Sequence, residues 1–585
     1  DFAFRSTVLR NGILKIQMEG RKAEIEKALV DALRLADIKD DQLFGNDQTK
    51  LHSLFMRATF CRQLLMHLLQ GEKHQDSSGR SLMDLRAMSL DLLNEACSLQ
   101  DAMMNSGALP LSTIFHKWGS PLELHAMPSA QLLLAEFCTD MVKLGREERG
   151  LTVDLAMEQS LASTAVQSLL HAMVSGMLEA VHSIPKLFSL LTIPDARKAF
   201  QDSVDGVPKW MFLRWVSQLM GRLATPEGHL YGDLLSSIAF EFPQAVIFPF
   251  NLAREDLARR LSGSDAQVLE RIRACVENPH IRKIIEDLDS LHHPNLRVTN
   301  RWKPLLSSKV DSPSEFNDIW NQMVENVFDE DVPGRGLLNK YFAREFGLLF
   351  KKDLHGAPSS KLDMLSKHKE KFDAIAKSFN GEKKLSDFSE SLANYESKEN
   401  TSGLLVPGQF QGLREPRDEE LVKVASFGKY VTVMSSKQRP KKITLYGSDQ
   451  KEYHFLFKGG EDLRQDQRIS EIFKAMNLIY SRDPSTAKRD LRLLHYEIIP
   501  MTPFMGLLEW VDNCSPLNSI LSGAFGKAAY EESLFHCQEL FNKSEMVQSS
   551  RKPAGMPPMC SVHLFEKRAD EKLLHMLECQ RALFP

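Results

Sequence analysis

Hydrophobic positions in residues 1–253 recur at the three- and four-residue spacing of amphipathic helices. Clear examples are the apolar faces within residues 25–36 and 54–68. The segment 208–220 opens with Pro208 and carries apolar side chains on more than one face, which predicts a helix buried on two sides. Prolines separate the helical segments, but no strict repeat period occurs. The pattern therefore predicts a mainly α fold that begins as a degenerate helical solenoid.

Residues 254–403 are also predicted to be helical, although they are more polar. Apolar positions around Trp320 and Phe328, and again around Leu338 and Phe342, predict a small helical bundle. The span 351–402 is rich in Lys, Ser and Glu and poor in large apolar residues. It is predicted to be a solvated helix and linker.

One stretch of the connecting region, Leu291-His292-His293-Pro294, looks like a metal-binding cluster. A histidine pair before a proline is more typical of a helix end, because a histidine favours the helix C-terminus and the residue before proline leaves the helix. We therefore predict a helix end at this position rather than a metal site.

At about residue 404 the period changes from helical to alternating, which predicts strands. Five strand candidates are marked by alternating apolar pairs: Val422 and Val424, Val431 and Val433, Ile443 and Leu445, Phe455 and Phe457, and Tyr496 and Ile498. A helix is predicted from Asp462 to Ser481, and a last strand from Met505 into Val511. This α+β arrangement, with a lysine ending the strand before the helix, is typical of a kinase amino-terminal lobe. The remainder, 512–585, is predicted to be an incomplete helical carboxyl lobe.

Composition and charge limit the possible functions. The chain has 585 residues, 43% hydrophobic and 26% charged, with a formal net charge of -4, so nothing in it gives a strong direct signal for nucleic-acid binding. No apolar run is long enough to cross a bilayer. The eight cysteines show no metal-ligand spacing and are expected to be reduced thiols. Because the chain starts at Asp1 rather than at a methionine, we expect it to be a piece of a longer protein.

The stretch FLFKGGEDLRQDQR, residues 455–468, carries the clearest chemistry. A strand delivers Lys458, two glycines turn the chain, and a helix follows that bears Glu461 and Asp466. Such an order can place an ammonium beside a phosphate and pair it with a carboxylate. Asp466 falls on the predicted apolar stripe of the helix, so it needs a partner, and Lys458 is the nearest candidate. The alternative is a capping acid beside a surface lysine.

The loop VMSSKQR, residues 433–439, is the candidate for covering the phosphates. Ser435 and Ser436 offer hydroxyl and backbone N–H groups. The loop lacks a glycine-rich pattern, so the alternative of a basic hairpin tip stays open on this stretch alone.

These motifs resemble one family. The sequences KGGEDLRQDQR, SSKQRPKK and YEIIPMTPFMGLLEWV are similar to the phosphatidylinositol-3-kinase-related protein kinases, and VPKWMFLRWVSQLM and FPQAVIFPF are similar to their helical region. The resemblance implies a FAT-like solenoid in 1–253, connecting helices with an FRB-like bundle in 254–403, and a kinase amino-terminal lobe with its hinge in 404–511. It also implies that the start of a carboxyl lobe occupies 512–585.

The resemblance also implies an ATP site. Lys458 would contact the phosphates, with Glu461 and Asp466 ordering it. The hinge would present the Glu509 carbonyl and the Val511 amide to adenine. Other implied contacts come from the inner pocket, the phosphate loop and its roof, and the hinge wall: Leu456, Tyr496, Met434, Ser435, Ser436, Pro440, Leu508 and Trp510.

The sequence departs from the family in one respect. Phosphoryl transfer needs an Asp, a His and an Asn on a catalytic loop and a magnesium-binding Asp in a DFG-like turn. No such motifs follow Val511, and Asp570 is the sole aspartate after Asn513. We therefore assign no catalytic residue and no magnesium ligand in this chain, although ATP and magnesium are the cofactors that the family implies.

Within the family, the double glycine after Lys458 and the pair Gln467-Arg468 favour the branch that is recruited to DNA double-strand breaks by the Ku heterodimer. The resemblance then implies a nuclear serine/threonine kinase that reaches DNA ends through Ku and phosphorylates proteins in non-homologous end joining. Two alternatives stay open: a non-catalytic helical scaffold or truncated form, and another family member such as a rapamycin-target kinase.

Overall fold

The computed structural model describes residues 22–36, 47–71, 73–109, 129–146, 153–294, 296–298, 313–328, 334–351, 358–377, 380–396, 403–412, 414–515, 517–526, 528 and 531. The chain divides into two compact units, Asp1–Trp510 and Val511–Pro585. In the second unit the described helix is α21 (Leu517–Phe525). Most of the predicted carboxyl lobe, including Asp570, lies outside the described residues.

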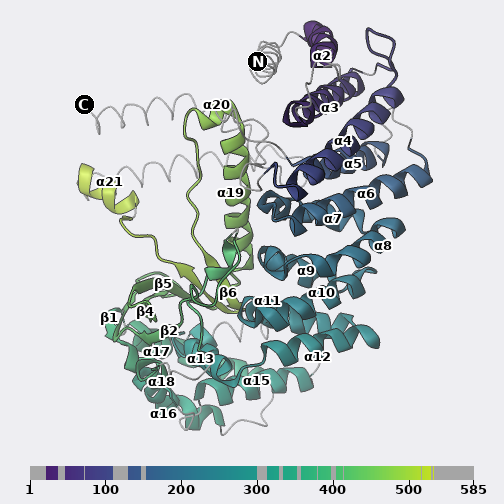
Figure 1. Cartoon of the computed structure of the whole chain (residues 1–585). Coiled ribbons are helices and arrows are strands. Elements are labelled where there is room, and N and C mark those ends of the chain that lie inside the picture. Colours follow the sequence, from purple (N-terminus) through teal and green to yellow (C-terminus); the bar gives the residue numbers. More distant parts are fainter. Residues whose placement is uncertain are drawn as a thin grey trace, which may run out of the picture. The chain divides into compact units, whose positions relative to one another are not determined.

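The first unit begins with helices that pack on their neighbours along the chain, as the predicted solenoid requires (Figure 1). These helices are α2 (Lys22–Ala36), α3 (Asp47–Gln70), α4 (Leu82–Asn105), α5 (Ala130–Arg146), α6 (Leu155–Val174), α7 (Ile184–Leu190), α8 (Pro194–Ser203), α9 (Val216–Arg222), α10 (Gly228–Glu241), α11 (Pro243–Arg260), α12 (Ser264–Val276) and α13 (Pro279–Asp289). Short 3-10 turns join some of them: η3 (Leu178–Ser183), η4 (Val204–Gly206) and η5 (Lys209–Trp215). None of the described helices combines the length and apolarity needed to span a membrane.

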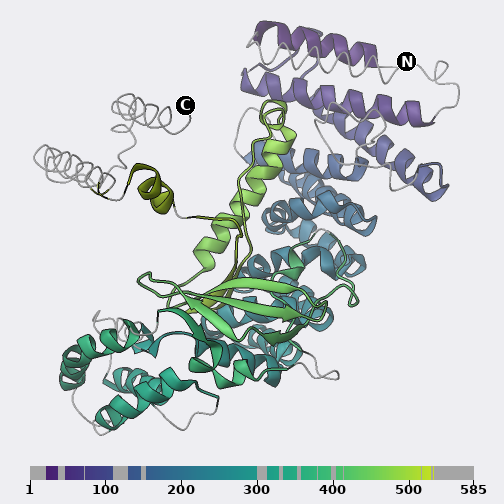
Figure 2. The same cartoon turned by 90° about the vertical axis from the view of Figure 1, so that its left-hand side faces the viewer.

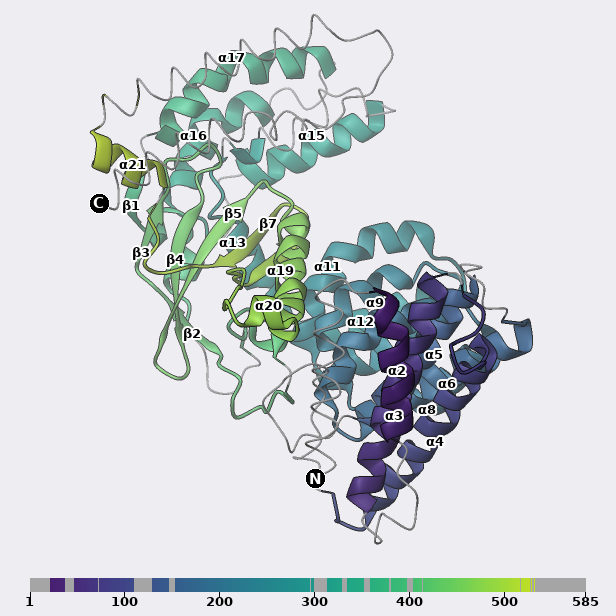
Figure 3. The same ribbon diagram turned by 90° about the horizontal axis from the view of Figure 1, so that it is seen from above.

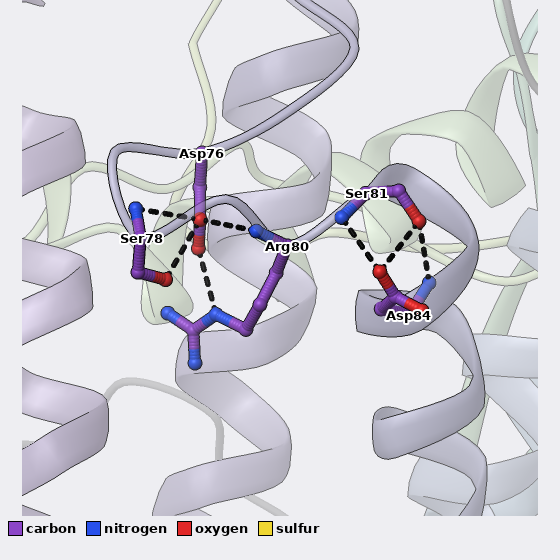
Figure 4. Close-up of polar contacts among 5 residues, drawn as sticks. All are labelled: Asp76, Ser78, Arg80, Ser81 and Asp84. Atoms are coloured by element: carbon purple, nitrogen blue, oxygen red, sulfur yellow. Dashed lines mark hydrogen bonds and ion pairs between the residues drawn. The ribbon is translucent and has the colours of Figure 1, made fainter.

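The turn between α3 and α4 shows how polar side chains fix a helix start (Figure 4). Asp76 accepts hydrogen bonds from the backbone N–H groups of Ser78 and Arg80, each at 2.9 Å, and from the Arg80 Nε at 2.8 Å. Burial opposes ionisation of Asp76, but these hydrogen bonds outweigh it and lower the pKa of the carboxyl group. Ser81 then caps α4 in a capping box with Asp84.

The segment 208–220 is buried as predicted, but it is not one α-helix. Residues Lys209–Trp215 form η5, and α9 starts only at Val216. Met211, Phe212 and Val216 are each at most 2% exposed. The packing therefore agrees with the sequence pattern, whereas the first turn is wound more tightly than that pattern predicts.

Three helices form the predicted small bundle: α15 (Pro313–Phe328), α16 (Leu337–Lys351) and α17 (Pro358–Lys377) (Figure 3). Aromatic side chains dominate its core. Phe342 is 1% exposed, and its ring centroid lies 5.0 Å from that of Phe372 and 4.9 Å from that of Phe346. This core forms a cluster of its own, and Ile375 of α17 packs against both this cluster and the main hydrophobic core.

A seven-stranded sheet follows in the described chain, with the order β1-β3-β4-β5-β7-β6 and β2 paired to β4. All paired strands are antiparallel. The strands are β1 (Gly381–Lys384), β2 (Val424–Phe427), β3 (Tyr430–Val433), β4 (Lys441–Gly447), β5 (Glu452–Gly459), β6 (Ile498–Thr502) and β7 (Met505–Glu509). The short elements η6 (Leu385–Asp387), α18 (Glu390–Ala393) and η7 (Gln409–Gln411) lie between β1 and β2. The predicted kinase-like α+β lobe is therefore present.

The sheet begins earlier than predicted. Strand β1 pairs with β3, with Gly381 opposite Val433, yet it lies in the span 351–402 that we predicted to be helix and linker, before the expected boundary at residue 404. Its sequence GEKK has no alternating apolar residues and is largely exposed. It is an edge strand defined by backbone pairing, which a hydrophobic pattern does not reveal.

Helix α19 (Arg464–Arg482) stands beside the solenoid helices, and the short α20 (Pro484–Ala487) follows it (Figure 2). One face binds the chain before β6: Ser470 Oγ donates to Tyr496 O at 2.9 Å, and Lys474 pairs with Glu497 at 2.7 Å. The predicted core-facing stripe is wrong in part, because Ile472 and Ile479 are 56% and 62% exposed. The periodicity identified the helix correctly but not the face that it buries.

Candidate nucleotide-binding site

Strand β5 places Lys458 in the middle of the candidate site. The strand pairs with β4 on one side and β7 on the other, and Lys458 lies opposite Gly506 of β7. Gly460 then takes a positive φ of 79°, which lets the chain turn sharply after the strand. The turn brings Glu461 Oε2 to 3.5 Å from Lys458 Nζ. The predicted lysine and acid are thus brought together, and Lys458 keeps a quarter of its side chain exposed.

Asp466 does not join this pair. It lies in the first turn of α19 and is half-buried. Among the described ion pairs, Lys458 contacts Glu461 and not Asp466, so the expectation that Lys458 is the partner of Asp466 is wrong in this structure. The acid on the turn reaches the lysine first because only two residues separate them, whereas Asp466 lies a helical turn further on.

An apolar floor lies next to the lysine. Leu456 on β5 faces Leu508 on β7 directly, and both pack with Leu463 and Ile498 in a small cluster. Leu463 immediately precedes α19 and is 1% exposed, so the cluster connects the sheet to the helix. Apolar side chains beside a cation are suited to a ligand with an aromatic base and a phosphate chain.

The predicted hinge leaves β7 at Trp510. The Trp510 N–H donates to His454 O at 3.0 Å, and the Lys442 ammonium lies 4.6 Å from the centre of the indole ring. The Glu509 N–H donates to Glu497 O at 2.8 Å, so the amide of this residue is committed to the sheet. Val511 begins the second unit. The two adenine hydrogen bonds expected from Glu509 and Val511 therefore stay predictions.

The predicted phosphate loop is the tip of the β3–β4 hairpin. Met434 N–H donates to Pro440 O at 2.9 Å and closes the hairpin, while Ser435 and Ser436 are exposed at its tip. Arg439 takes a positive φ of 49°. Pro440 is buried and Tyr496 is 38% exposed. The serines are available to a ligand, as the phosphate-loop prediction requires, and the hairpin tip is exposed and basic, as the alternative requires.

The histidine pair contacts the lobe. Helix α13 ends at Asp289, before the pair, as predicted. His293 Nδ1 lies 2.9 Å from the fully buried Lys441 Nζ, which is 5.1 Å from the centre of the Phe388 ring. Burial, with the nearby Arg439 charge, lowers the pKa of Lys441 well below its usual value. The sequence did not reveal this contact, because its partners lie 148 residues apart.

His292, the other histidine of the pair, packs against the strand that carries Lys458. A Cβ added to Gly459 would lie 2.7 Å from His292 Cγ, so strand β5 can approach the histidine only with glycine at this position. Within the described residues no group of His, Cys, Asp or Glu has an arrangement suited to a metal ion. The pair contacts the lobe at two places: His293 at Lys441, and His292 at Gly459, the residue that follows Lys458.

The antiparallel sheet and helix α19 have the arrangement of a kinase amino-terminal lobe. Residues 452–575 match the family described as phosphatidylinositol 3- and 4-kinase. The chain belongs to the phosphatidylinositol-3-kinase-related protein kinases.

Relatives with curated names agree with this assignment. The chain is 32% identical over 416 residues, 67% of its length, to the DNA-dependent protein kinase catalytic subunit of Dictyostelium discoideum. It is 29% identical over 68% of its length to the protein of the same name from Gallus gallus. It is also similar to the serine/threonine-protein kinase TOR of Arabidopsis thaliana, with 24% identity over 50% of the chain and 12% of that relative. The chain spans about a tenth of the length of the two DNA-dependent protein kinase relatives.

Proposed function

We propose that this chain supplies the ATP-binding lobe of a serine/threonine protein kinase and the helical region attached to it. The observation that carries the proposal is the register of β5 against β7. It sets Lys458 beside the apolar floor and one strand away from the hinge, while Glu461 lies 3.5 Å from the ammonium. This order of cation, acid, apolar side chains and hinge suits a nucleoside triphosphate.

ATP with magnesium is the proposed cofactor. Lys458 would bind the phosphate oxygens, Glu461 would keep the ammonium oriented, and the surface formed by Leu456 and Leu508 would receive the adenine ring. The groups that position the hydroxyl nucleophile and the metal are not assigned in this chain. The proposal therefore concerns nucleotide binding here and phosphoryl transfer by the protein of which this lobe is part.

We further propose that this protein acts in double-strand break repair by non-homologous end joining, in the nucleus, with the Ku heterodimer and DNA ends as partners and other proteins as substrates. The support comes from the relatives named DNA-dependent protein kinase catalytic subunit, which match 67% and 68% of the chain, against 50% for the TOR relative. The net charge of -4 favours recruitment to DNA through a partner rather than by direct contact.

The nucleotide proposal is tested by measuring ATP binding to the chain by isothermal titration calorimetry, with and without magnesium. We expect Lys458→Ala to weaken ATP binding about tenfold or more, because a charge-assisted contact to phosphate is lost. Lys451→Ala is the matched control, since Lys451 precedes the same strand, is 75% exposed and pairs only with Asp449 among the described carboxylates. Equal losses in the two variants, or no ATP binding in the parent chain, would contradict the proposal and favour the helical scaffold.

The repair proposal needs a separate experiment. Cells in which the endogenous gene carries Lys458→Ala are expected to rejoin radiation-induced breaks slowly, although the protein is still recruited with Ku. Tight binding of a rapamycin–immunophilin complex to the bundle of α15, α16 and α17, with normal break repair in the variant cells, would instead assign the chain to the TOR branch.

A further inference from the structure

A cavity of about 850 Å³ lies within the first unit, between the solenoid and α19. Its walls come from four places along the chain: the end of η5 with α9, helix α11, the segment 404–411, and the first three turns of α19 with the start of β6. The candidate ATP-site lysine, Lys458, does not line it. Its volume is in the range of pockets that bind small molecules, about 300–1,000 Å³.

The cavity is preformed because the segment 404–411 is tied down at both ends. Gln244 of α11 donates from Nε2 to Gly403 O at 2.8 Å and accepts from Leu405 N–H at 2.8 Å. Gln409 donates at 2.8 Å to a backbone carbonyl of the chain that leads into β2. The wall formed by this segment is therefore ordered before any ligand arrives.

Most of the lining is apolar. Trp215 and Phe248 line the solenoid side, and Ile472 lines the side formed by α19. The Trp215 indole N–H already donates to Val181 O at 2.8 Å, so this side chain offers its ring rather than a hydrogen bond. Ile472 is 56% exposed, which is costly for an isoleucine on a helix and is relieved when an apolar ligand covers it.

The charged side chains that line the cavity carry an excess of positive charge. Its charged lining consists of Arg214, Asp256, Arg260, Arg464, Arg468 and Glu471, four cations against two anions. Three of the arginines have partners: Arg214 pairs with Glu471, Arg260 with Asp256, and Arg464 with Asp462. Arg468 is exposed and has no carboxylate oxygen of the described residues within 4.0 Å; the nearby charge of Asp462, which pairs directly with Arg464, acts on it from a longer distance. The excess positive charge is thus concentrated at one arginine next to the apolar wall.

We propose that this cavity binds a small amphiphilic anion. Its apolar body occupies the space between Phe248 and Ile472, and its carboxylate or phosphate head pairs with the guanidinium of Arg468. The apolar lining favours an apolar body in the ligand, and the guanidinium of Arg468 favours a negatively charged head group. A neutral apolar molecule leaves Arg468 without a direct ion pair, and a compact polar anion leaves Ile472 exposed to water.

The cavity and the candidate ATP site are neighbours: α19, which lines the cavity, begins three residues after Glu461, and Ile498 both lines the cavity and packs with Leu508. Occupancy of the cavity and occupancy of the ATP site are therefore expected to affect each other reciprocally. This coupling rests on the proposed function, whereas binding in the cavity does not, so the two are measured separately.

The test uses 8-anilinonaphthalene-1-sulfonate, an aromatic anion that fluoresces in apolar surroundings, displaced by dodecyl phosphate below its micelle-forming concentration. We expect Arg468→Gln to weaken dodecyl phosphate binding about tenfold, because a charge-assisted contact is lost. Ala475→Trp is expected to abolish displaceable binding, because an indole from this exposed position fills the cavity. Ile472→Asp, also at an exposed position, is expected to do the same by charge repulsion. Arg492→Gln removes an exposed arginine outside the lining and should behave as the parent chain.

Hydrogen exchange locates the bound anion. Added dodecyl phosphate should protect residues 404–411 and 464–475 in the parent chain and not in Ala475→Trp. The proposal is overturned if Ala475→Trp and Ile472→Asp bind as the parent does, or if Arg468→Gln has no more effect than Arg492→Gln. Equal displacement by uncharged dodecanol would refute the role of the anionic head. Loss of ATP binding in Lys458→Ala, with dodecyl phosphate binding intact, would show that the two sites are separate.

Discussion

Gly459→Ala should disturb the strand that carries the candidate phosphate-binding lysine. Gly459 does not have a positive φ, so alanine meets no backbone strain there; the added methyl group would instead lie 2.7 Å from His292 Cγ and 2.9 Å from His292 Cδ2. Carbon atoms prefer a separation of about 3.5–4.0 Å, so strand and imidazole must move apart by about 1 Å. Overpacking of this kind costs about 1–3 kcal/mol.

The assay is native-state hydrogen exchange on peptides from β5, which measures the free energy of local opening. Gly459→Ala should lower that free energy by about 1–3 kcal/mol and weaken ATP binding, because Lys458 is its neighbour. In a chain that already carries His292→Ala, the same substitution should cost less, because the two imidazole atoms are gone and only the Cβ of residue 292, at 3.0 Å from the added methyl group, remains close. Gly221→Ala is the control, because a Cβ there meets nothing within 4 Å. An equal loss in both His292 backgrounds would refute the steric argument.

Three further predictions concern stability. Asp76→Asn should destabilise the start of α4 by about 2 kcal/mol at neutral pH, because the charged hydrogen bond from Arg80 is lost. Because the pKa of Asp76 is lowered in the folded state, this difference in stability should persist above pH 3.8 and disappear as the pH falls through the native pKa. Thermal unfolding of both proteins at several pH values measures it. Gln244→Leu should release the segment 403–411, seen as faster hydrogen exchange there, because two hydrogen bonds are lost at about 1 kcal/mol each; unchanged exchange would contradict its role. Phe342→Ala should destabilise the α15–α17 bundle by about 3–5 kcal/mol. Hydrogen exchange in the sheet should change much less, since Phe342 belongs to the cluster of the bundle and not to the main core.

The sequence predicted those strands whose side chains alternate between core and solvent. Ile443 and Leu445 are 2% and 1% exposed, and Phe455 and Phe457 are 4% and 1% exposed, as their alternation requires. The edge strand 381–384 was not predicted, because its side chains are largely exposed and only its backbone pairs with the sheet. Alternation reports burial, and a strand that buries little leaves no such pattern.

The contacts of the candidate site also differ in whether the sequence could predict them. Lys458 and Glu461 are close in sequence, so the turn between them could be predicted from local chemistry. The contacts of His293 and His292 could not, because their partners lie in strands 148 and 167 residues later and nothing in a histidine pair identifies them. Helical periodicity likewise placed Ile472 on an apolar stripe, but it could not indicate that this stripe borders a cavity rather than the core.

The two hydrogen bonds of Gln244 also constrain the order in which the chain can fold. Their partners lie 159 and 161 residues further along. At about 5–20 residues per second, a ribosome needs roughly 8–30 s to deliver Gly403 and Leu405 after Gln244 has emerged. During that time the surface of α11 around Gln244 lacks the segment 404–411 that covers it in the folded chain. A kinase lobe made without α11 would lack these two hydrogen bonds, whereas those of Gln409 would still hold the segment 404–411.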